Sequence, residues 1–357
     1  MSVRGLGRRL YNGEVSIDFV GRRKLWYAIS GAILIVCIGA LIFRGLNLGI
    51  EFRGGASFSV PNATCSIEQA RTAAESTSGG QAIVTKSANG TITVQTEPLS
   101  ADQSLVVSSQ LAKACGVQAG DIKAQIVGPT WGAEISKKAL QGLLVFLLLV
   151  SIFLAIYFEW RMAVAALVAL AHDLVITIGI YAVTGLEVTP ATVIGLLTIL
   201  GYSLYDTVVV FDKVKENTRG IAGQSVMTYS EAANLAVNQT LVRSINTSIV
   251  ALLPVLAIII VGAGLLGAGT LLDLAVALAV GMAAGAYSSI FIATPFLAQI
   301  KSRQPEMRAL QARVLARRRQ AVASGEPMPA PGSAPSTRVA TGPRQQPRRQ
   351  ARSRRSR

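Results

Sequence analysis

Four ionisable residues lie inside, or at the edge of, long apolar stretches of the chain. Asp206 stands six positions before the next charged residue, Asp212. His172 and Asp173 are adjacent near the middle of another apolar stretch, and Arg243 comes two positions before a third. A charged side chain inside a membrane span costs about 2.5–3.5 kcal/mol, and such residues usually mark an ion or proton pathway. We therefore predict a proton relay formed by Asp206, Arg243, Asp173 and His172.

The predicted relay would couple protonation to helix movement. Burial favours a neutral carboxyl group, whereas a nearby guanidinium favours the carboxylate. Asp206 and Arg243 lie at comparable depths from the cytoplasmic ends of their helices, so the two side chains could pair. One elementary charge moved across 100 mV corresponds to about 2.3 kcal/mol, enough to bias a conformational equilibrium. Three polar residues are predicted to be adjacent to the relay: Ser203, Tyr205 and Asn246.

A static arrangement is the alternative for the same residues. Asp206 could form a fixed ion pair that only sets helix packing, and His172 could simply hydrogen-bond within the bundle. Adjacent helical residues point about 100° apart, so at most one of His172 and Asp173 faces squarely inward. A purely structural scaffold has no need to bear the cost of buried charges, which favours the relay.

The composition places the chain among integral membrane proteins. Of its 357 residues, 51% are hydrophobic and only 15% are charged, whereas a soluble protein carries about a quarter charged residues. The net charge of +15 is concentrated in residues 301–357, which hold fifteen basic and two acidic residues. It therefore belongs to a tail and does not indicate a nucleic-acid-binding fold. The chain shows no catalytic triad, metal-ligand cluster or phosphate-binding motif, so we predict no enzyme activity, cofactor or metal.

Six apolar segments come close to, or exceed, the 20 or so helical residues that a hydrocarbon core of about 30 Å requires. They are residues 25–43, 139–158, 162–183, 189–211, 245–261 and 271–297. Lys and Arg gather before the first segment, after the fourth and in the tail, which predicts that both termini are cytoplasmic. Gly281 and Gly285 in the sixth segment have the small-xxx-small spacing of close helix contacts, although a glycine-rich span without such a contact is the alternative.

The polar region between the first two spans predicts a small folded domain outside the cytoplasm. Strand-like and helical segments follow one another there in the order βαββαβ, which is the ferredoxin-like arrangement. Its two helices lie antiparallel on one face of the sheet, which brings Cys65 and Cys115 together. We predict a disulfide between them, with two free thiols as the alternative. Gly54 and Gly55 precede the first strand and predict a turn or, alternatively, a hinge.

These segments divide the chain into five parts. The parts are a cytoplasmic segment 1–24, a first span 25–44, an extracytoplasmic domain 45–138, a five-span bundle 139–300 and a basic tail 301–357. The start of the tail predicts a basic helix along the cytoplasmic leaflet, and the rest is predicted to be largely disordered. Its arginines predict contact with anionic membrane lipids.

Four motifs resemble a known family. "GYSLYDTVVVFDKVKEN" resembles the fourth-span signature of SecF proteins, and "LNLGIEFRGG" resembles their motif after the first span. "AHDLVITIGIYAVTGLEVT" resembles the third span, and "IDFVGRRKLWYAISG" resembles the entry to the first. The resemblance covers about residues 10–300 in the same order and places the chain with the SecD/SecF family of the RND superfamily. The predicted fold is therefore an α-helical, RND-type bundle of six spans with a ferredoxin-like domain between the first two.

The resemblance implies a role in protein export from a bacterial cell. SecF-like proteins are multi-pass proteins of the inner or plasma membrane that work with SecD, using the proton motive force to promote late steps of Sec-dependent translocation. The implied partners are SecD, the SecYEG translocon, secreted unfolded polypeptides and, as accessory candidates, YajC and YidC. Asp206 and Arg243 match the family residues implicated in proton use, and Asp173 matches the aspartate of its third-span His-Asp pair.

The chain departs from the family pattern at a few positions. Tyr205 stands where Asn is common, and Lys213 and Lys215 stand where Arg is common. Two other functions remain as alternatives. One is half of an RND-type exporter of small molecules or lipids, although a single domain of about 80 residues leaves little room for a substrate funnel. The other is a purely structural translocase scaffold.

Overall fold

The computed structural model describes residues 16–86, 90–261 and 269–324 of the chain. Within them, six helical stretches are long and apolar enough to cross a membrane. These stretches are Arg23–Phe43, Pro129–Tyr157, Trp160–Thr184, Pro190–Gly223, Tyr229–Val261 and Leu272–Ser302. The six stretches, with a small α/β domain between the first and second, confirm the predicted fold class. Most of the predicted segment 1–24 and the tail beyond residue 324 lie outside the described residues.

The first five spans contain the helices α2 (Arg23–Phe43), α6 (Pro129–Tyr157), α7 (Trp160–Thr184), α8 (Pro190–Asn217) and α9 (Tyr229–Ile258). Two of them begin earlier than predicted, α6 by ten residues and α9 by sixteen. Their first turns are polar, so hydropathy does not mark them. Local signals do: Pro129 is the first residue of α6, and Thr228 caps α9 in a reciprocal capping box with Glu231.

The sixth span changes its helical geometry partway along. It runs as α10 (Gly269–Ser288), a π-helical segment (Ser289–Ala293) and α11 (Thr294–Ser302). A π-helical turn is wider than an α-helical one and is frequent at functional sites. The change of register falls between Ser288 and Ser289, so these neighbours stand on differently wound turns.

Glycines bring α10 into close contact with α8. A Cβ atom added to Gly281 would lie 2.3 Å from the Ile199 side chain, and one added to Gly285 would lie 2.7 Å from Ser203 Cβ. Both distances are too short for a real Cβ, so both glycines of the small-xxx-small pattern serve this contact. Gly285 thereby lets Ser203 of α8 approach α10 one turn from Ser288.

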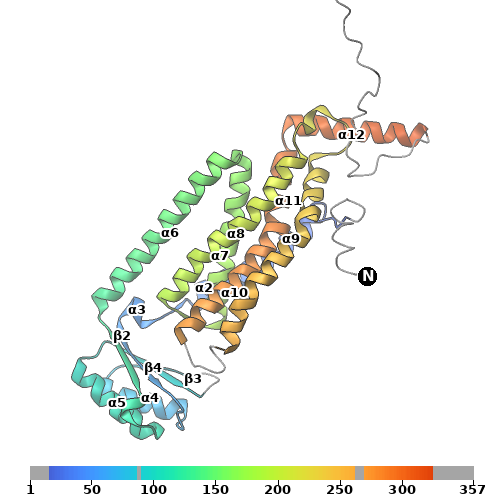
Figure 1. Ribbon diagram of the computed structural model, residues 1–357. Helices are drawn as coiled ribbons and strands as arrows, with labels where there is room; N and C mark the ends of the chain where they lie inside the picture. The colour runs from blue at the N-terminus through green and yellow to red at the C-terminus, as the bar shows by residue number, and fades with distance from the viewer. Residues whose placement is uncertain (1–15, 87–89, 262–268, 325–357) are drawn as a thin grey trace, which may run out of the picture.

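The α/β domain between the first and second spans lies at one end of the bundle (Figure 1). Its sheet has the strand order β3-β4-β2-β5, with all neighbours antiparallel. The strands are β2 (Gly55–Val60), β3 (Ile83–Lys86), β4 (Ile92–Thr96) and β5 (Lys123–Val127). The helices are α4 (Ile67–Ser78) and α5 (Ala101–Cys115), followed by a 3-10 turn at Ala119–Asp121. This order is that of the ferredoxin-like βαββαβ fold.

Both domain helices begin with a reciprocal capping box, built on Ser66 and Ser100. Each ends at a glycine in the left-handed conformation, Gly79 and Gly116, which satisfies the last turn. The start of α4 therefore lies beside the end of α5. There the Sγ atoms of Cys65 and Cys115 are bonded as a disulfide at 2.06 Å.

The domain and the segment that leads into it contact the loop between the third and fourth spans through a strand pair and a side-chain hydrogen bond. β1 (Asn47–Leu48), which follows α2, pairs in parallel with β6 (Glu187–Val188), which lies between α7 and α8. The Gln95 side chain on β4 donates a hydrogen bond to Glu187 Oε1 at 2.6 Å. One sheet of the domain is thus linked directly to the loop between the third and fourth spans.

The chain enters and leaves the domain at one place. α3 (Ile50–Arg53) ends at Gly54, whose φ of 77° is left-handed, and Gly55 follows with φ of 145°. A Cβ on Gly54 would lie 2.8 Å from Pro129 Cα, and one on Gly55 would lie 2.5 Å from the Thr96 carbonyl oxygen. Both glycines are therefore required by backbone conformation and close approach, as the predicted turn needs.

At the opposite end of the bundle, α12 (Pro305–Ser324) lies across the helix ends (Figure 1). Leu310 and Val314 are fully buried in the same hydrophobic cluster as residues of the spans. Arg318 forms a two-pronged ion pair with Glu231, at 2.7 and 2.9 Å. The hydrogen bonds with Glu231 raise the pKa of Arg318, burial lowers it, and the Glu231 charge raises it, so that the net direction is upward. The apolar side of α12 predicted to face the leaflet is therefore partly used for packing within the protein.

Two asparagines of α9 hold the backbone that precedes the first span. Asn234 Oδ1 accepts hydrogen bonds from the N–H groups of Phe19, at 2.8 Å, and Val20, at 3.2 Å. Asn238 Oδ1 accepts from the N–H of Ile17 at 2.8 Å. The described part of the N-terminal segment is therefore fixed to the fifth span.

Candidate proton-transfer site

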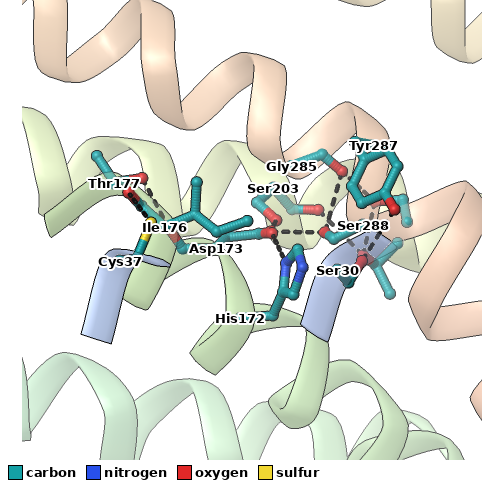
Figure 2. Close-up of polar contacts among 12 residues, drawn as sticks. Ser30, Cys37, His172, Asp173, Ile176, Thr177, Ser203, Gly285, Tyr287 and Ser288 are labelled. Atoms are coloured by element: carbon teal, nitrogen blue, oxygen red, sulfur yellow. Dashed lines mark hydrogen bonds and ion pairs between the residues drawn. The ribbon is translucent and has the colours of Figure 1, made fainter. Parts of the chain in front are cut away.

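Asp173 on α7 is the most enclosed ionisable residue of the predicted relay, with 0% of its surface exposed. Three groups from three places converge on its carboxylate (Figure 2). Ser288 Oγ of α10 donates to Oδ2 at 2.7 Å, and Ser203 Oγ of α8 donates to the same oxygen. His172 Nδ1 lies 3.0 Å from Oδ1. The charge of an ionised Asp173 is thus stabilised mainly by neutral donors.

His172 faces the same centre but keeps one nitrogen unpaired. The residue is 6% exposed, and its Nε2 atom is buried with no hydrogen-bond partner among the described residues. Its ring stacks near Tyr287, with 6.0 Å between ring centroids. The Tyr287 hydroxyl in turn bonds Ser30 Oγ of α2 at 2.9 Å, as Figure 2 shows. Both members of the predicted His-Asp pair therefore contribute to one buried polar cluster.

Asp206 on α8 forms a second buried centre. It is 6% exposed, and Ser244 Oγ of α9 donates to its carboxylate. The Ser289 side chain, at the start of the π-helical segment, hydrogen-bonds the Thr207 hydroxyl, one position after Asp206. Like Asp173, this aspartate is held by a hydroxyl group from another helix.

Arg243 lies near Asp206 but makes no ion pair with it in the described part of the chain. Its guanidinium donates to the Tyr205 hydroxyl at 3.4 Å, and both side chains are exposed, Tyr205 by 52%. The structure therefore does not have the direct Asp206–Arg243 pair that comparable depth allowed. Adjacent positions on α9 point about 100° apart, and Ser244, not Arg243, faces Asp206.

Of the three residues predicted to be adjacent to the relay, one is buried in the bundle and two are exposed on its surface. Ser203 is 2% exposed and belongs to the Asp173 centre. Tyr205 and Asn246 are exposed on α8 and α9. Among the described residues Tyr205 contacts Arg243, whereas Asn246 forms no hydrogen bond with either aspartate.

Three polar residues that the sequence did not single out lie beside these centres: Thr207, Ser288 and Ser289. Ser289 Oγ lies 2.9 Å from Thr207 Oγ1, and Ser288 and Ser289 both donate to the Gly285 carbonyl oxygen, at 3.3 and 2.8 Å. Ser288 lies three positions after Gly285, so it shares a helix face with the glycine that packs on α8. That spacing was a signal for Ser288. No comparable signal marked Ser289, because its direction depends on the π-helical turn.

A further acidic group lies outside the spans, at the junction with the domain. Burial raises the pKa of Glu187, the hydrogen bond from Gln95 lowers it, and the nearby Glu51 charge raises it. The net direction is upward. In the part of the chain that the structure describes, no group of three or more His, Cys, Asp or Glu residues could hold a metal ion.

Two family models match the chain. Residues 107–303 match the model of the protein export membrane protein SecD/SecF, C-terminal, and residues 39–61 match the SecD/SecF GG motif. The second match includes the Gly54–Gly55 pair at the domain entry. The first covers the second to sixth spans and therefore both aspartate centres.

Named relatives cover most of the chain. The protein translocase subunit SecF of Streptomyces coelicolor is 56% identical over 322 residues, which are 90% of this chain and 86% of that protein. The corresponding protein of Mycobacterium tuberculosis is 44% identical over 87% of this chain and 73% of its own.

A solved structure shares the fold. The crystal structure of SecDF, a translocon-associated membrane protein from Thermus thermophilus, matches with a TM-score of 0.73 and 31% identity. The match covers 81% of this chain and 39% of that one, so the chain corresponds to part of a longer SecDF protein. With the family models and relatives, this confirms the resemblance: the chain belongs to the SecF family of protein translocase subunits.

Proposed function

We propose that the chain, together with SecD, uses the proton motive force to promote late steps of Sec-dependent protein translocation. The observation that carries the proposal is the pair of buried aspartates, Asp173 and Asp206, each held by hydroxyl groups from other helices. Proton uptake and release at these carboxyls would drive the movement of helices that supports export.

The energetic argument rests on the absence of a fixed counter-charge. A buried carboxylate without a bonded cation is expensive, whereas a neutral carboxyl group that is hydrogen-bonded is not. Neither aspartate forms an ion pair with Lys or Arg in the described ranges, and His172 is charged only if it is protonated. Serine hydroxyls both donate and accept, so they fit either form of the acid. Such a centre is suited to gain and lose a proton.

The exposed face of α8 and α9 supports a partner within the membrane. Arg243 and Tyr205 are exposed at the depth of the spans, where lipid would leave the guanidinium poorly solvated. The relatives include a protein in which SecD and SecF are one chain. We therefore propose that a SecD helix covers this face. From the family relationship we also propose that the chain acts with the SecYEG translocon on secreted unfolded polypeptides.

The proposed orientation has both termini in the cytoplasm of a bacterial cell. Exposed arginines of α12, such as Arg308 and Arg319, would then lie near the inner leaflet. Each basic residue near an anionic surface contributes about 1 kcal/mol of attraction. The proposal thus includes contact between this end of the molecule and anionic lipids.

The test replaces Asp206 with Asn in the native chromosome. Because asparagine is close in size but does not ionise, we expect export of a secreted reporter to slow by about tenfold or more. The matched control is Asp212→Asn, the same change further along α8, where the carboxylate accepts a hydrogen bond from the exposed Tyr157 hydroxyl at 3.1 Å. Pulse-chase release of the reporter measures both.

Two outcomes would overturn the proposal. Normal export by the Asp206→Asn strain would assign the chain a structural role in the translocase. Export assistance that persists after the proton gradient is dissipated, with ATP held constant, would remove the proton as the coupling ion.

A further inference from the structure

We propose that a groove on the side of the bundle binds one acyl chain of an anionic phospholipid, with the lipid phosphate at Lys24. The groove lies between α2, α7 and the sixth span and has a volume of about 480 Å³. It is separate from the exposed face of α8 and α9 where a SecD helix is proposed. The inference does not depend on the use of protons by the chain.

Small residues hollow out the groove. Ser30 and Gly31 of α2 and Ala171 of α7 are among the residues that line it. A Cβ atom added to Gly31 would meet no other atom within 4 Å, whereas one added to Gly281 would collide with the Ile199 side chain. Gly31 therefore opens space at the surface of the bundle and does not serve a helix contact.

The length of the groove corresponds to one half of the membrane. Its α2 wall is a stripe of residues on one helix face that runs from Tyr27 to Ile38. This stretch of helix rises by about 16 Å. Half of a hydrocarbon core of about 30 Å is about 15 Å. The groove is therefore long enough for an acyl chain from a single leaflet.

The walls of the groove favour hydrocarbon over water. Apolar side chains from all three spans line most of its length, among them Leu34, Val175 and Phe296. The Ser30 hydroxyl is already bonded to the Tyr287 hydroxyl at 2.9 Å, and the Tyr27 hydroxyl and His172 Nε2 are buried. A bound water needs two to four polar partners. These walls present too few accessible polar atoms to hold a chain of waters.

The end of the groove near α12 suits a lipid headgroup. Gln299 lines this end, three residues before α11 ends at Ser302. Lys24 is exposed one turn before Tyr27 on the same face of α2, and it forms no ion pair within the described residues. Long lysine side chains near helix ends reach the membrane interface, and an ammonium group binds phosphate as a point charge. Charge therefore favours an anionic lipid at this end.

The position of the groove has a consequence for the buried His-Asp pair. His172 is one of the lining residues and is 6% exposed, and its Nδ1 atom faces Asp173 Oδ1 at 3.0 Å. An acyl chain in the groove lies over His172. Occupancy of the site therefore shields the pair from water on this side of the bundle.

The experiment maps a photoactivatable lipid on the full chain. The chain is reconstituted in phosphatidylcholine nanodiscs that contain a trace of phosphatidylglycerol with a diazirine near the end of one acyl chain. After illumination, mass spectrometry locates the labelled residues. Leu148 of α6, which is 60% exposed, gives the reference for ordinary lipid contact. We expect Leu34, Val175 and Phe296 to be labelled more strongly than this reference, because a bound chain stays in contact with them.

Filling the groove tests the site directly. Gly31→Leu places a side chain in the open space, and we expect labelling of the groove to fall to the level of the α6 reference. The matched control is Gly39→Leu on the same helix, where an added Cβ also meets no atom within 4 Å but the residue does not line the groove. It should keep the labelling. If Gly31→Leu fails to fold, Ala171→Leu fills the groove from α7 and should cause the same loss.

A change at Lys24 tests the headgroup. We expect the phosphatidylglycerol probe to label the groove about fivefold more than a phosphatidylcholine probe with the same acyl chains, which is the factor for one basic residue at an anionic group. Lys24→Gln should remove this preference and leave the groove open to either lipid. The control is Arg22→Gln, two positions earlier on a different face of the chain, which should keep the preference.

Three results would overturn parts of the proposal. Labelling of the groove that is no stronger than the α6 reference, or that Gly31→Leu does not reduce, removes the site. Equal labelling by the two headgroups removes the phosphate from Lys24. Loss of labelling when the chain is copurified with SecD assigns the groove to a protein partner. None of these measurements follows export, so each result is separate from that of the Asp206→Asn strain.

Discussion

The α/β domain and the membrane bundle differ in whether they bury ionisable side chains. The domain packs its sheet against α4 and α5 through an apolar core that excludes charge. Fully buried members of that core include Phe58, Ile92, Val94, Val107 and Leu111. The bundle buries a histidine and two aspartates, together with serines and threonines that bond them. Among the residues that the structure describes, the buried groups able to exchange a proton lie in the bundle and not in the domain.

This difference suggests how the two regions divide the work. An apolar core closed by capping boxes and a disulfide has one well-packed arrangement, so the domain is suited to move as a rigid body. A polar network with more acceptors than hydrogens has alternative arrangements of similar energy. The bundle is therefore the region in which a small chemical change can alter the structure.

The largest expected effect concerns the disulfide. The Cys65–Cys115 bond closes a loop with a sequence separation of 50, for which chain entropy predicts about 4 kcal/mol of stabilisation. Changing both cysteines to Ser should lower the free energy of unfolding of the domain by about this amount. Hydrogen exchange of β2 and β4 in urea measures it, and exchange in α7 and α8 provides the internal control.

Reductant should reproduce this result on the unchanged chain, because Cys37 is the only other cysteine. If exchange in α7 and α8 increased as much as exchange in the sheet, the domain and the bundle would form one cooperative unit. The contrast between a rigid domain and an adaptable bundle would then be wrong.

A smaller effect is expected for removal of the Asp173 carboxylate. Asp173→Ala leaves the donors of His172, Ser203 and Ser288 buried without their acceptor, at a cost of about 3 kcal/mol in the stability of the bundle. Asp173→Asn keeps an acceptor of the same shape and should cost about 1 kcal/mol. Reversible unfolding in mixed micelles compares the two variants. Equal costs would mean that the polar network does not stabilise the helix packing.

The smallest effect concerns pH at the junction of the two regions. Because the pKa of Glu187 is raised in the docked structure, docking binds a proton and is favoured at acidic pH. This contribution of Glu187 to docking is fully present below the ordinary pKa of a carboxyl group. It is lost as the pH rises through the raised pKa of the docked state. Groups facing Glu187 are Gln95 of the sheet, Glu51 of α3 and Asp273 of α10.

Hydrogen exchange at the β1–β6 pair, corrected for the intrinsic rate, checks this pH dependence. The N–H of Gly49, which donates to the Val188 carbonyl at 3.0 Å, reports on docking. Protection should be higher near pH 5 than near pH 7. Glu187→Gln should remove most of the difference, and protection that rises with pH would contradict the assignment.

Much of the fold was predictable because it depends on patterns within one segment. Hydropathy located all six spans, and alternation with capping signals gave the order of the domain's strands and helices. The starts of α6 and α9 were missed because their first turns are polar and lie beyond the apolar core. Helix signals such as Pro129 and the Thr228–Glu231 capping box were available for both.

The site was predictable only in part because it depends on directions between helices. Buried charge identified Asp173 and Asp206, and depth placed Arg243 near the second. Depth does not fix rotation about the helix axis, so Ser244 was not distinguished from Arg243 as the group that faces Asp206. The contact of Ser289 with Thr207 comes from the first residue of a π-helical turn that no residue pattern predicted.

The contact between Gly54 and Pro129 limits how the α/β domain can reorient. The incoming chain at α3 and the outgoing chain at α6 touch there, and a Cβ on Gly132 would lie 2.8 Å from the Phe52 carbonyl oxygen. Two separated tethers would let a domain sway or slide. Because the two connecting segments contact each other at one point, the domain can rotate about that point more easily than it can slide. A force that pulls on the domain would therefore apply a torque to the first and second spans while this contact holds.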